Sequence, residues 1–385
     1  MSLRLMQSGL VLGLAACGSA GTPSAATIAE RPFTATEVAR FSTPWAMEFL
    51  PGSGVPLTGT ALLTEREGKL WLLNSADGSK QAVAGVPQVK VGGQGGLGDV
   101  VVHPGFAGNQ RVYLSFVESG PNDTSGAALG YGRLILGSGQ PRLAGFKVIW
   151  RQSPKVSGDG HFSHRIAFAP DGSLFLTSGE RQKFDPAQSL TGNLGKVLHL
   201  TDEGAPAPGN PWAGRGGIAA SFWSIGHRNL LGVQFAPDGR LWEIEMGPRG
   251  GDELNLIQPG KNYGWPRASN GSNYDGSDIP DHRAGDGFEA PKLWWNPSIS
   301  PAGLLIYTGD LFPQWKGDAL IGALSGEALI HVDIAGDSAR KADQWPMGAR
   351  IRAVDQGPRG EVYLLEDGES GGRLLRLEPK GQARR

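Results

Sequence analysis

IAFAPDGSLFLTSG (166–179) and VQFAPDGRLWEIEM (233–246) are two versions of one pattern, in which two apolar segments flank a Pro-Asp-Gly turn. Such a pattern is typical of a β-hairpin. Four further segments of alternating apolar residues around a glycine-containing turn bring the number to six. These four are residues 61–74, 98–117, 303–324 and 351–367.

The spacing of the hairpins indicates the architecture. They recur on average about 55 to 60 residues apart, which leaves room for four strands in each interval. Helical periodicity is nearly absent, whereas a Rossmann fold would need helices between its strands. The sequence therefore predicts an all-β protein with the fold of a six-bladed β-propeller. In such a fold the loops of several blades meet at the channel mouth, so functional residues should be scattered along the chain.

Composition narrows the range of partners. The chain has 385 residues, and its 60 Gly and 27 Pro are interleaved with 11 Trp and 14 Phe, which indicates a turn-rich protein with a large core rather than disorder. Lys and Arg (36) almost balance Asp and Glu (37), and no basic block is present. Nucleic acid is therefore not an expected partner.

The N-terminus has the features of an export signal. An apolar stretch follows Arg4, and the small residues that precede Cys17 form a lipobox-like end. The alternative is a plain secretory signal with an incidental cysteine. We expect an export signal over residues 1–17, a flexible tether over 18–35 and the catalytic propeller over 36–380. The expected location is the periplasm, with a lipid on Cys17 as the membrane anchor.

The loop SGDGHFSH (157–164) precedes a strand and holds the first catalytic candidate. A neutral His161 at a blade end is suited to remove a hydroxyl proton as a general base. Next along the chain is the tetrapeptide GHRN (226–229), in which the guanidinium of Arg228 lies beside the amide of Asn229. This pair is suited to hold carbonyl or carboxylate oxygens. The alternatives are that His161 is an ordinary loop histidine and that residues 226–229 form a surface turn.

Two turns of the sequence have oxygen atoms that could bind a metal ion. EMGPRGGDELN (245–255) and GKNYGWP (260–266) combine exposed backbone carbonyls with carboxylates, which are calcium ligands, although the spacing is not that of an EF-hand. Earlier in the chain, GGQGGLG (92–98) lets the backbone approach a flat ligand. Near the end, Arg350 and Arg352 alternate on one strand face and favour an anion. The alternatives are a hairpin loop for the glycines and a solvated face for the arginines.

In this order, the motifs resemble those of the soluble glucose and aldose sugar dehydrogenases that depend on pyrroloquinoline quinone (PQQ). The resemblance covers residues 40–378 and includes HPGF (103–106) and PSISPAG (297–303). It implies the same six-bladed fold, PQQ and calcium as cofactors, an aldose as substrate and an electron acceptor that the sequence does not identify.

The resemblance also implies a role for each candidate residue. His161 would take the proton of the anomeric hydroxyl while hydride leaves for PQQ. The quinone oxygens would be bound by Arg228, which also assists catalysis, and by Asn229. The PQQ carboxylates would be held by Gln94, which also faces the substrate, and by Arg350 and Arg352.

The same resemblance implies two calcium sites and a sugar contact. The carbonyls of Gly247 and Pro248 would hold the catalytic calcium. The Glu253 side chain and the Tyr263 carbonyl would hold a second, structural one. Trp295 would give an apolar face to the sugar ring, with core packing as the alternative.

Three departures from the family pattern bear on the site. Ser325 stands where related sequences carry a lysine that contacts PQQ. His164 follows the catalytic histidine, and it is expected to narrow the sugar pocket or to shift the pKa of His161 if the rings are close. Gly160 directly precedes His161, which leaves Asp159 as the acid expected to orient it.

Two other functional classes share this fold. A calcium-dependent propeller hydrolase would act on lactones or esters, and a non-catalytic propeller would only bind a ligand. The two cationic pairs, Arg228 with Asn229 and Arg350 with Arg352, favour the dehydrogenase because a hydrolase has no need to bind a tricarboxylic quinone.

Overall fold

The computed structural model describes residues 30–52, 59–137 and 139–381. The expected export signal, Cys17 and most of the expected tether lie outside these residues. Within them, no helix is long and apolar enough to cross a membrane.

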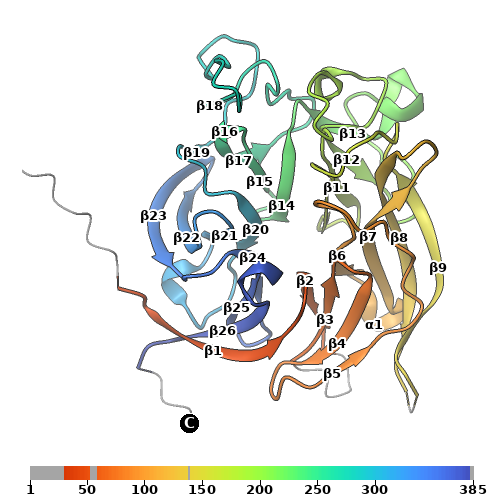
Figure 1. Cartoon of the computed structure of the whole chain (residues 1–385), viewed down its shortest axis with the longest axis vertical. Coiled ribbons are helices and arrows are strands. Elements are labelled where there is room, and N and C mark those ends of the chain that lie inside the picture. Colours follow the sequence, from red (N-terminus) through yellow and green to blue (C-terminus); the bar gives the residue numbers. More distant parts are fainter. Residues whose placement is uncertain (1–29, 53–58, 138, 382–385) are drawn as a thin grey trace, which may run out of the picture.

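Six four-stranded antiparallel sheets surround a central axis, which confirms the all-β, six-bladed propeller (Figure 1). In every blade the first strand lies nearest the axis and the fourth lies outermost. From inner to outer, the strands are β2 (Pro44–Phe49), β3 (Thr60–Glu65), β4 (Lys69–Asn74) and β5 (Lys80–Ala82) in blade 1; β6 (Leu97–Val102), β7 (Arg111–Ser119), β8 (Ser125–Ile135) and β9 (Arg142–Arg151) in blade 2; β10 (Ser163–Phe168), β11 (Leu174–Ser178), β12 (Lys196–Leu200) and β13 (Phe222–Ile225) in blade 3; β14 (Asn229–Phe235), β15 (Leu241–Met246), β17 (Asp252–Ile257) and β19 (Leu293–Trp295) in blade 4; β20 (Pro301–Ile306), β21 (Ala319–Ala323), β22 (Ala328–Ala335) and β23 (Ser338–Pro346) in blade 5; and β24 (Ile351–Gln356), β25 (Val362–Glu366), β26 (Arg373–Pro379) and β1 (Phe33–Arg40) in blade 6.

The two ends of the propeller domain close the ring. Strand β1 pairs with β26 in antiparallel register, from Phe33 opposite Pro379 to Arg40 opposite Arg373. The propeller therefore begins by residue 33, earlier than the expected boundary at residue 36, because residues 33–35 already belong to a strand. A partner about 340 residues away gives no local signal, so the composition of this segment could not reveal the pairing.

The expected hairpins correspond to strands, with one difference. Five of them are the first two strands of their blades, whereas residues 61–74 form β3 and β4, the second and third strands of blade 1. The inner strand β2 escaped sequence analysis because ten residues separate it from β3, so the two strands do not form a short hairpin pattern in the sequence.

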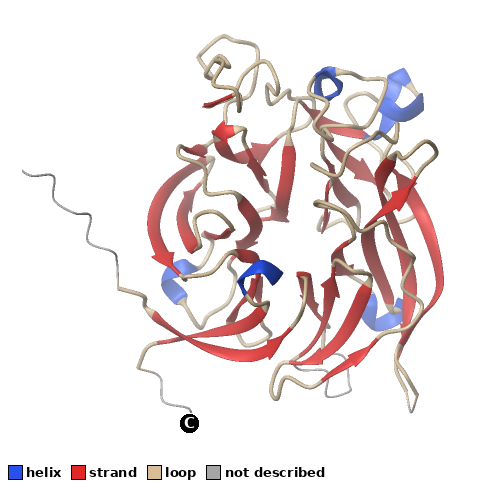
Figure 2. Cartoon of the chain, viewed as in Figure 1, coloured by secondary structure: helices blue, strands red, loops and turns tan. Residues whose placement is uncertain are grey.

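The six inner strands determine where the loops of the different blades meet. Strands β2, β6, β10, β14, β20 and β24 contact one another around the axis, and all of them begin at the same mouth of the central channel. Apolar side chains pack between the blades, and Trp242, Trp315 and Trp345 are among the largest that are fully buried. Near the centre of the face seen in Figure 2 lies the short helix η5 (Gly368–Ser370). The loops that lead into the inner strands therefore define one mouth.

Candidate active site

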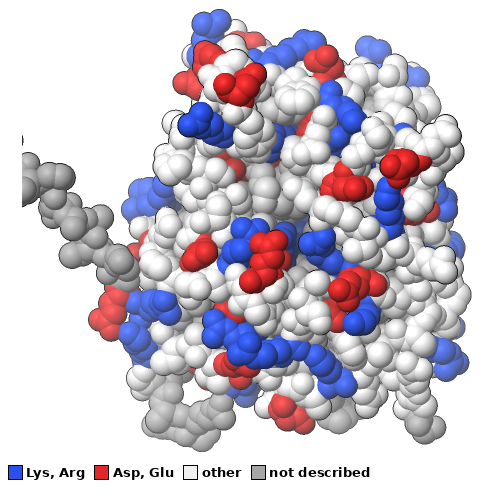
Figure 3. All heavy atoms as spheres, viewed as in Figure 1, with Lys and Arg blue, Asp and Glu red and all other residues white. Residues whose placement is uncertain are grey.

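A cavity of about 290 Å³ lies at the mouth where the inner strands begin. Residues at or just before the strand starts line it, and they include Gln94, Arg350 and Arg352. The structure thus brings together three of the expected cofactor-binding residues, which are up to 258 positions apart in the sequence. In Figure 3, Lys and Arg side chains flank the centre of this face, with Asp or Glu side chains among them.

Arg350 and Arg352 do share one face of β24. The Nε of Arg350 and an Nη of Arg352 each lie 3.1 Å from Oδ2 of Asp367. Burial raises the pKa of Asp367, but the two guanidinium groups outweigh it and hold the pKa below its ordinary value. The carboxylate orients both arginines, and the Nε of Arg352 has no hydrogen-bond partner among the described residues.

Sequence analysis missed a third guanidinium at this cavity. Arg66, in the turn between β3 and β4, lines the cavity and donates hydrogen bonds to the carbonyls of Gly93 and Gly95. Nothing in the local sequence distinguishes this turn from an ordinary surface hairpin. Ser325 bonds to the hydroxyl of Ser300 at 2.8 Å and adds no charge, so Arg66 is the third cation here.

The glycine-rich loop holds Gln94 against the histidine loop. Oε1 of Gln94 accepts the backbone N–H of His161 at 2.8 Å, and it lies 3.5 Å from Nδ2 of Asn229. Gly93 has a φ of 49°, and a Cβ there would lie 2.4 Å from the Asp159 carbonyl oxygen. Glycine is therefore required for the close approach of the two loops.

Glu180, not Asp159, orients His161. The Nδ1 of His161 is hydrogen-bonded to Oε1 of Glu180, and the two side chains are only 7% and 1% exposed. Asp159 instead faces Lys90, at 3.8 Å. Glu180 is 19 residues from His161 in the sequence, but the pairing of β10 with β11 places it beside the ring because Ser163 lies opposite Ser178.

Electrostatics keep His161 neutral. Burial lowers its pKa, Arg228 and Arg181 add to this effect, and Glu180 opposes it without reversing the shift. The neutral ring donates from Nδ1 to Glu180 and leaves Nε2 as the nitrogen that can accept a proton. Backbone strain is concentrated here, because His161 has a φ of 51° and Gln182 and Phe184, whose N–H groups bind Glu180, have φ of 59° and 63°.

His164 lies beneath the cavity and forms part of its floor. Its ring stacks on Trp45 with centroids 5.2 Å apart, and its Nδ1 lies 2.7 Å from Oγ of Ser115. Burial lowers the pKa of His164 to about 3, so the ring is uncharged. It is not among the groups that shift the pKa of His161.

Arg228 and Asn229 lie at the start of β14. An Nη of Arg228 donates to the carbonyls of Met246 (3.0 Å) and Gly247 (2.6 Å), and the other Nη lies 3.2 Å from the hydroxyl of Tyr274. The Nε of Arg228 has no partner among the described residues. The guanidinium does not itself line the cavity, but it ties Met246, which does, to the turn that begins at Gly247.

The four residues expected to bind calcium meet at one small cavity. Gly247, Pro248, Glu253 and Tyr263 all line it. Burial raises the pKa of Glu253 to about 7, while Nε2 of His282, 3.7 Å away, opposes this shift. A buried carboxyl beside backbone carbonyls is an oxygen-rich environment that suits a hard cation.

Trp295 does not line either of these cavities. It is 5% exposed, packs in the hydrophobic core of blades 4 and 5, and has the ammonium of Lys341 5.1 Å from its ring centre. Trp295 lies on β19, the outermost strand of blade 4, where it pairs with β17. Because its ring is almost completely buried there, it offers no face to a sugar at the channel mouth. The alternative interpretation, core packing, is the one that this placement supports.

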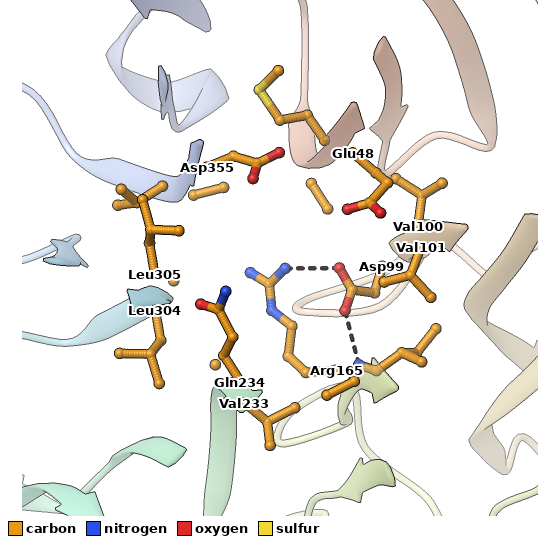
Figure 4. A pocket seen from close by; sticks show the side chains of 18 of the residues that line it. Glu48, Asp99, Val100, Val101, Arg165, Val233, Gln234, Leu304, Leu305 and Asp355 are labelled. Carbon is orange, nitrogen blue, oxygen red and sulfur yellow. Dashed lines mark hydrogen bonds and ion pairs between the residues drawn. The ribbon is translucent and has the colours of Figure 1, made fainter. Parts of the chain in front are cut away.

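A second cavity, of about 330 Å³, lies at the opposite end of the inner strands (Figure 4). Its polar lining is mainly acidic, with the carboxylates of Glu48, Asp99 and Asp355 around the channel. Arg165 is the one cation among the lining residues, and it pairs with Asp99 at 3.0 Å. None of the candidate residues from sequence analysis lies here.

Comparisons with known proteins identify the family. The glucose/sorbosone dehydrogenase family matches residues 41–376. An aldose sugar dehydrogenase of Escherichia coli is 40% identical over 342 residues, which cover 88% of this chain and 90% of that protein. The solved structure of the soluble E. coli aldose sugar dehydrogenase in its apo form has a TM-score of 0.84 at 38% identity and covers 90% of this chain and 100% of that chain. The PQQ-bound aldose sugar dehydrogenase of Streptomyces coelicolor has a TM-score of 0.73 at 28% identity, with 90% and 98% covered. The chain therefore belongs to the glucose/sorbosone dehydrogenase family of sugar-oxidising enzymes.

Proposed function

We propose that this protein oxidises aldose sugars at the anomeric carbon, with PQQ as the hydride acceptor, calcium as a second cofactor and His161 as the general base. The observation that carries the proposal is the buried pair of His161 and Glu180 beside a cavity with three guanidinium groups. The S. coelicolor relative is described as PQQ-bound, which supports the choice of cofactor.

The residues at the cavity suit an anionic quinone. Arg66, Arg350 and Arg352 offer three positive charges against the two carboxylates of Asp367 and Glu369. Planar guanidinium groups bind carboxylates through paired hydrogen bonds, and the unpaired Nε of Arg352 is a donor still to be satisfied. An anion that fills the cavity would therefore meet a surplus of donors.

The chain's own groups account for the movement of the proton. Glu180 fixes the His161 ring through Nδ1, so that Nε2 can receive the proton of the anomeric hydroxyl. Arg228 and Asn229 offer N–H donors to the quinone oxygens. When bound, PQQ supplies the acceptor for the hydride that leaves the anomeric carbon.

Calcium would be held at the small cavity that Arg228 lines together with Gly247 and Pro248. The carbonyls of Gly247 and Pro248 would bind an ion that acts as a Lewis acid, and Glu253 with the Tyr263 carbonyl would bind a structural one. In the structure the Gly247 carbonyl already accepts Arg228 at 2.6 Å, so that one oxygen links the arginine to the expected ion.

Reconstitution tests the proposal. Purified protein without the export signal is incubated with PQQ and calcium, and dye reduction is measured with glucose and other aldoses, with and without a chelator. Activity that needs sugar, PQQ and calcium is the expected result. PQQ binding without turnover would favour a binding propeller, and lactone or ester hydrolysis without PQQ would favour a calcium-dependent hydrolase.

We also propose that the protein is exported and anchored in the periplasm through a lipid on Cys17. The lipobox-like sequence supports this, and the electron acceptor would then be a periplasmic or membrane carrier. Labelling of cells with a radioactive fatty acid should mark the protein, and Cys17→Ser should abolish the label and release the protein from the membrane fraction. A labelled Cys17→Ser protein would contradict the anchor.

A further inference from the structure

Four polar side chains are buried together inside blade 4. Glu243 and Glu245 lie two residues apart on β15, and so share one face of the strand. Their partners across the ladder are Asn255 and Glu253 on β17. All four are buried, and Glu243 and Asn255 have exposed fractions of 0%. Three carboxylates and one carboxamide therefore meet in a part of the molecule that solvent does not reach.

The hydrogen bonds of this cluster are incomplete. Nδ2 of Asn255 lies 3.2 Å from a carboxylate oxygen of Glu243, 3.2 Å from one of Glu245 and 3.3 Å from one of Glu253. An amide nitrogen has two hydrogens, so it cannot serve all three carboxylates. Within the described residues, Oε1 of Glu243 and Oδ1 of Asn255 have no partner at all. Buried polar atoms in this state require an explanation, and a bound ion is one that would satisfy both of them.

The carboxyl groups of the cluster also lack a strong cationic partner among the described residues. Among the residues that the structure describes, no Lys or Arg lies within ion-pair distance of Glu243, Glu245 or Glu253. Within the described ranges, their basic neighbours are His227, 3.1 Å from Glu245, and His282, 3.7 Å from Glu253. Burial of unpaired carboxylates is costly, so each group either holds a proton, as the raised pKa of buried Glu243 indicates for the site without an ion, or binds a cation. Elsewhere in the protein, buried Glu366 faces the guanidinium of Arg373.

We propose that a calcium ion, or a similar hard divalent cation, binds between Glu243, Glu245 and Asn255. Ligand atoms of His227, Glu243 and Glu245 all lie within 4.8 Å of one another. Two oxygens bound to one calcium at about 2.4 Å each can be up to roughly that far apart. An end-for-end turn of the Asn255 carboxamide would add Oδ1 to the site, and the two orientations of an amide are hard to distinguish.

The ligand set points to calcium rather than to a transition metal. Both ring nitrogens of His227 are already bonded, one to Glu245 and the other to Oγ of Ser224 at 2.8 Å. The histidine therefore orients Glu245 from outside, and only oxygen atoms remain for the ion. The proposed site adjoins the small cavity of Glu253 and Tyr263, which Glu245 also lines, and it differs from that cavity in Glu243, which does not line it.

The ion would support the residues that face the quinone pocket. The other oxygen of Glu245 accepts the backbone N–H of Arg228 at 2.6 Å. A cation that fixes Glu245 would thus fix the start of β14, where Arg228 and Asn229 project. It would act as a structural ion and would not touch the substrate.

The test counts ions in protein that contains neither PQQ nor sugar, so its outcome does not depend on the proposed dehydrogenase activity. Chelator-stripped protein is titrated with calcium by calorimetry, and the bound ions are counted by elemental analysis. Glu243→Gln is expected to bind one calcium fewer per chain and to gain less thermal stability from calcium. Glu366→Gln removes a buried carboxylate that has its own cation, and it should bind as many ions as the unchanged protein.

An unchanged ion count and affinity in Glu243→Gln would overturn the proposal and would mean that Glu243 holds a proton instead. If that variant does not fold, crystals of the unchanged protein grown with calcium decide the matter. An anomalous scattering peak between Glu243 and Asn255 is expected. Peaks confined to Gly247, Pro248, Glu253 and Tyr263, with none at Glu243, would overturn the proposal.

Discussion

The two ends of the central channel are built from the same six inner strands and carry opposite charges. At the end where the strands begin, Arg66, Arg350 and Arg352 line the cavity. At the end where the strands finish, Glu48, Asp99 and Asp355 line it, and Arg165 is bound to Asp99 (Figure 4). The strands themselves are nearly equivalent, so the difference lies in single residues and in the loops.

The difference shows where this fold has placed its chemistry. At the cationic end, strained loop residues such as His161 and Phe184 are held in place by hydrogen bonds to Glu180. At the acidic end, the cavity is lined by residues of the strands, and burial raises the pKa of Asp355 to about 7. One end has the cationic groups and the neutral histidine that the proposed function requires, whereas the other has a local environment that disfavours its own charges.

The largest expected effect separates the two ends directly. His161→Ala should reduce turnover by about 100-fold or more, because a general base contributes at least that much, while PQQ stays bound. Asp355→Asn, at the acidic end, should leave turnover unchanged. Steady-state dye reduction with reconstituted protein measures both. Normal turnover in His161→Ala would show that another group takes the proton.

The second comparison is between the two acids near His161. Glu180→Gln should lower turnover by about 10-fold or more, because the ring loses its charged partner. Asp159→Asn should have little effect, since Asp159 faces Lys90. Equal losses in the two variants would contradict the role given to Glu180.

The pH profile sharpens this test. The pKa of His161 lies below its ordinary value of 6.5, so activity should persist at pH 6.5 and fall only at lower pH, where the base becomes protonated. Glu180 raises the pKa of the ring, and its removal should move this acid limb to still lower pH. A purely structural role for Glu180 would lower the rate without moving the limb.

Cofactor retention tests the cationic end. Arg66→Ala and Arg350→Ala should each weaken PQQ binding by about 10-fold, the loss expected for one charge-assisted contact. Arg340→Ala removes an exposed guanidinium on an outer strand and should not change it. Equilibrium dialysis or the absorbance of bound PQQ gives the affinity. If Arg66→Ala binds PQQ normally, Arg66 only supports the glycine-rich loop.

The smallest effect concerns the acidic end. Because the folded protein raises the pKa of Asp355 above its unfolded value, this group lowers stability progressively as pH rises from about 4 to about 7. Asp355→Asn should therefore raise the melting temperature by about 1 to 2 °C at pH 8 and have almost no effect near pH 4. An equal shift at both pH values would mean that the carboxyl titrates normally.

The sequence by itself determined the architecture and three of the residues that line the cavity at the channel mouth, Gln94, Arg350 and Arg352. Six hairpins carry their own turns and alternation, so they predict six blades from local information, and the pattern of Arg350 and Arg352 already fixes a shared face. His161 and Gln94 stand in glycine-rich loops that mark a functional mouth. Those features depend on residues that are neighbours in the chain.

Only the tertiary structure decided which distant groups meet. Glu180 reaches His161 through strand register, Arg66 reaches the pocket of Arg350 by closure of the ring, and the pairing of β1 with β26 joins the two ends of the propeller. Trp295, expected at a sugar site, lies in the core instead, because strand register decides which face of a blade a tryptophan joins. Contacts of this kind depend on pairing between strands far apart in sequence, and no local pattern encodes them.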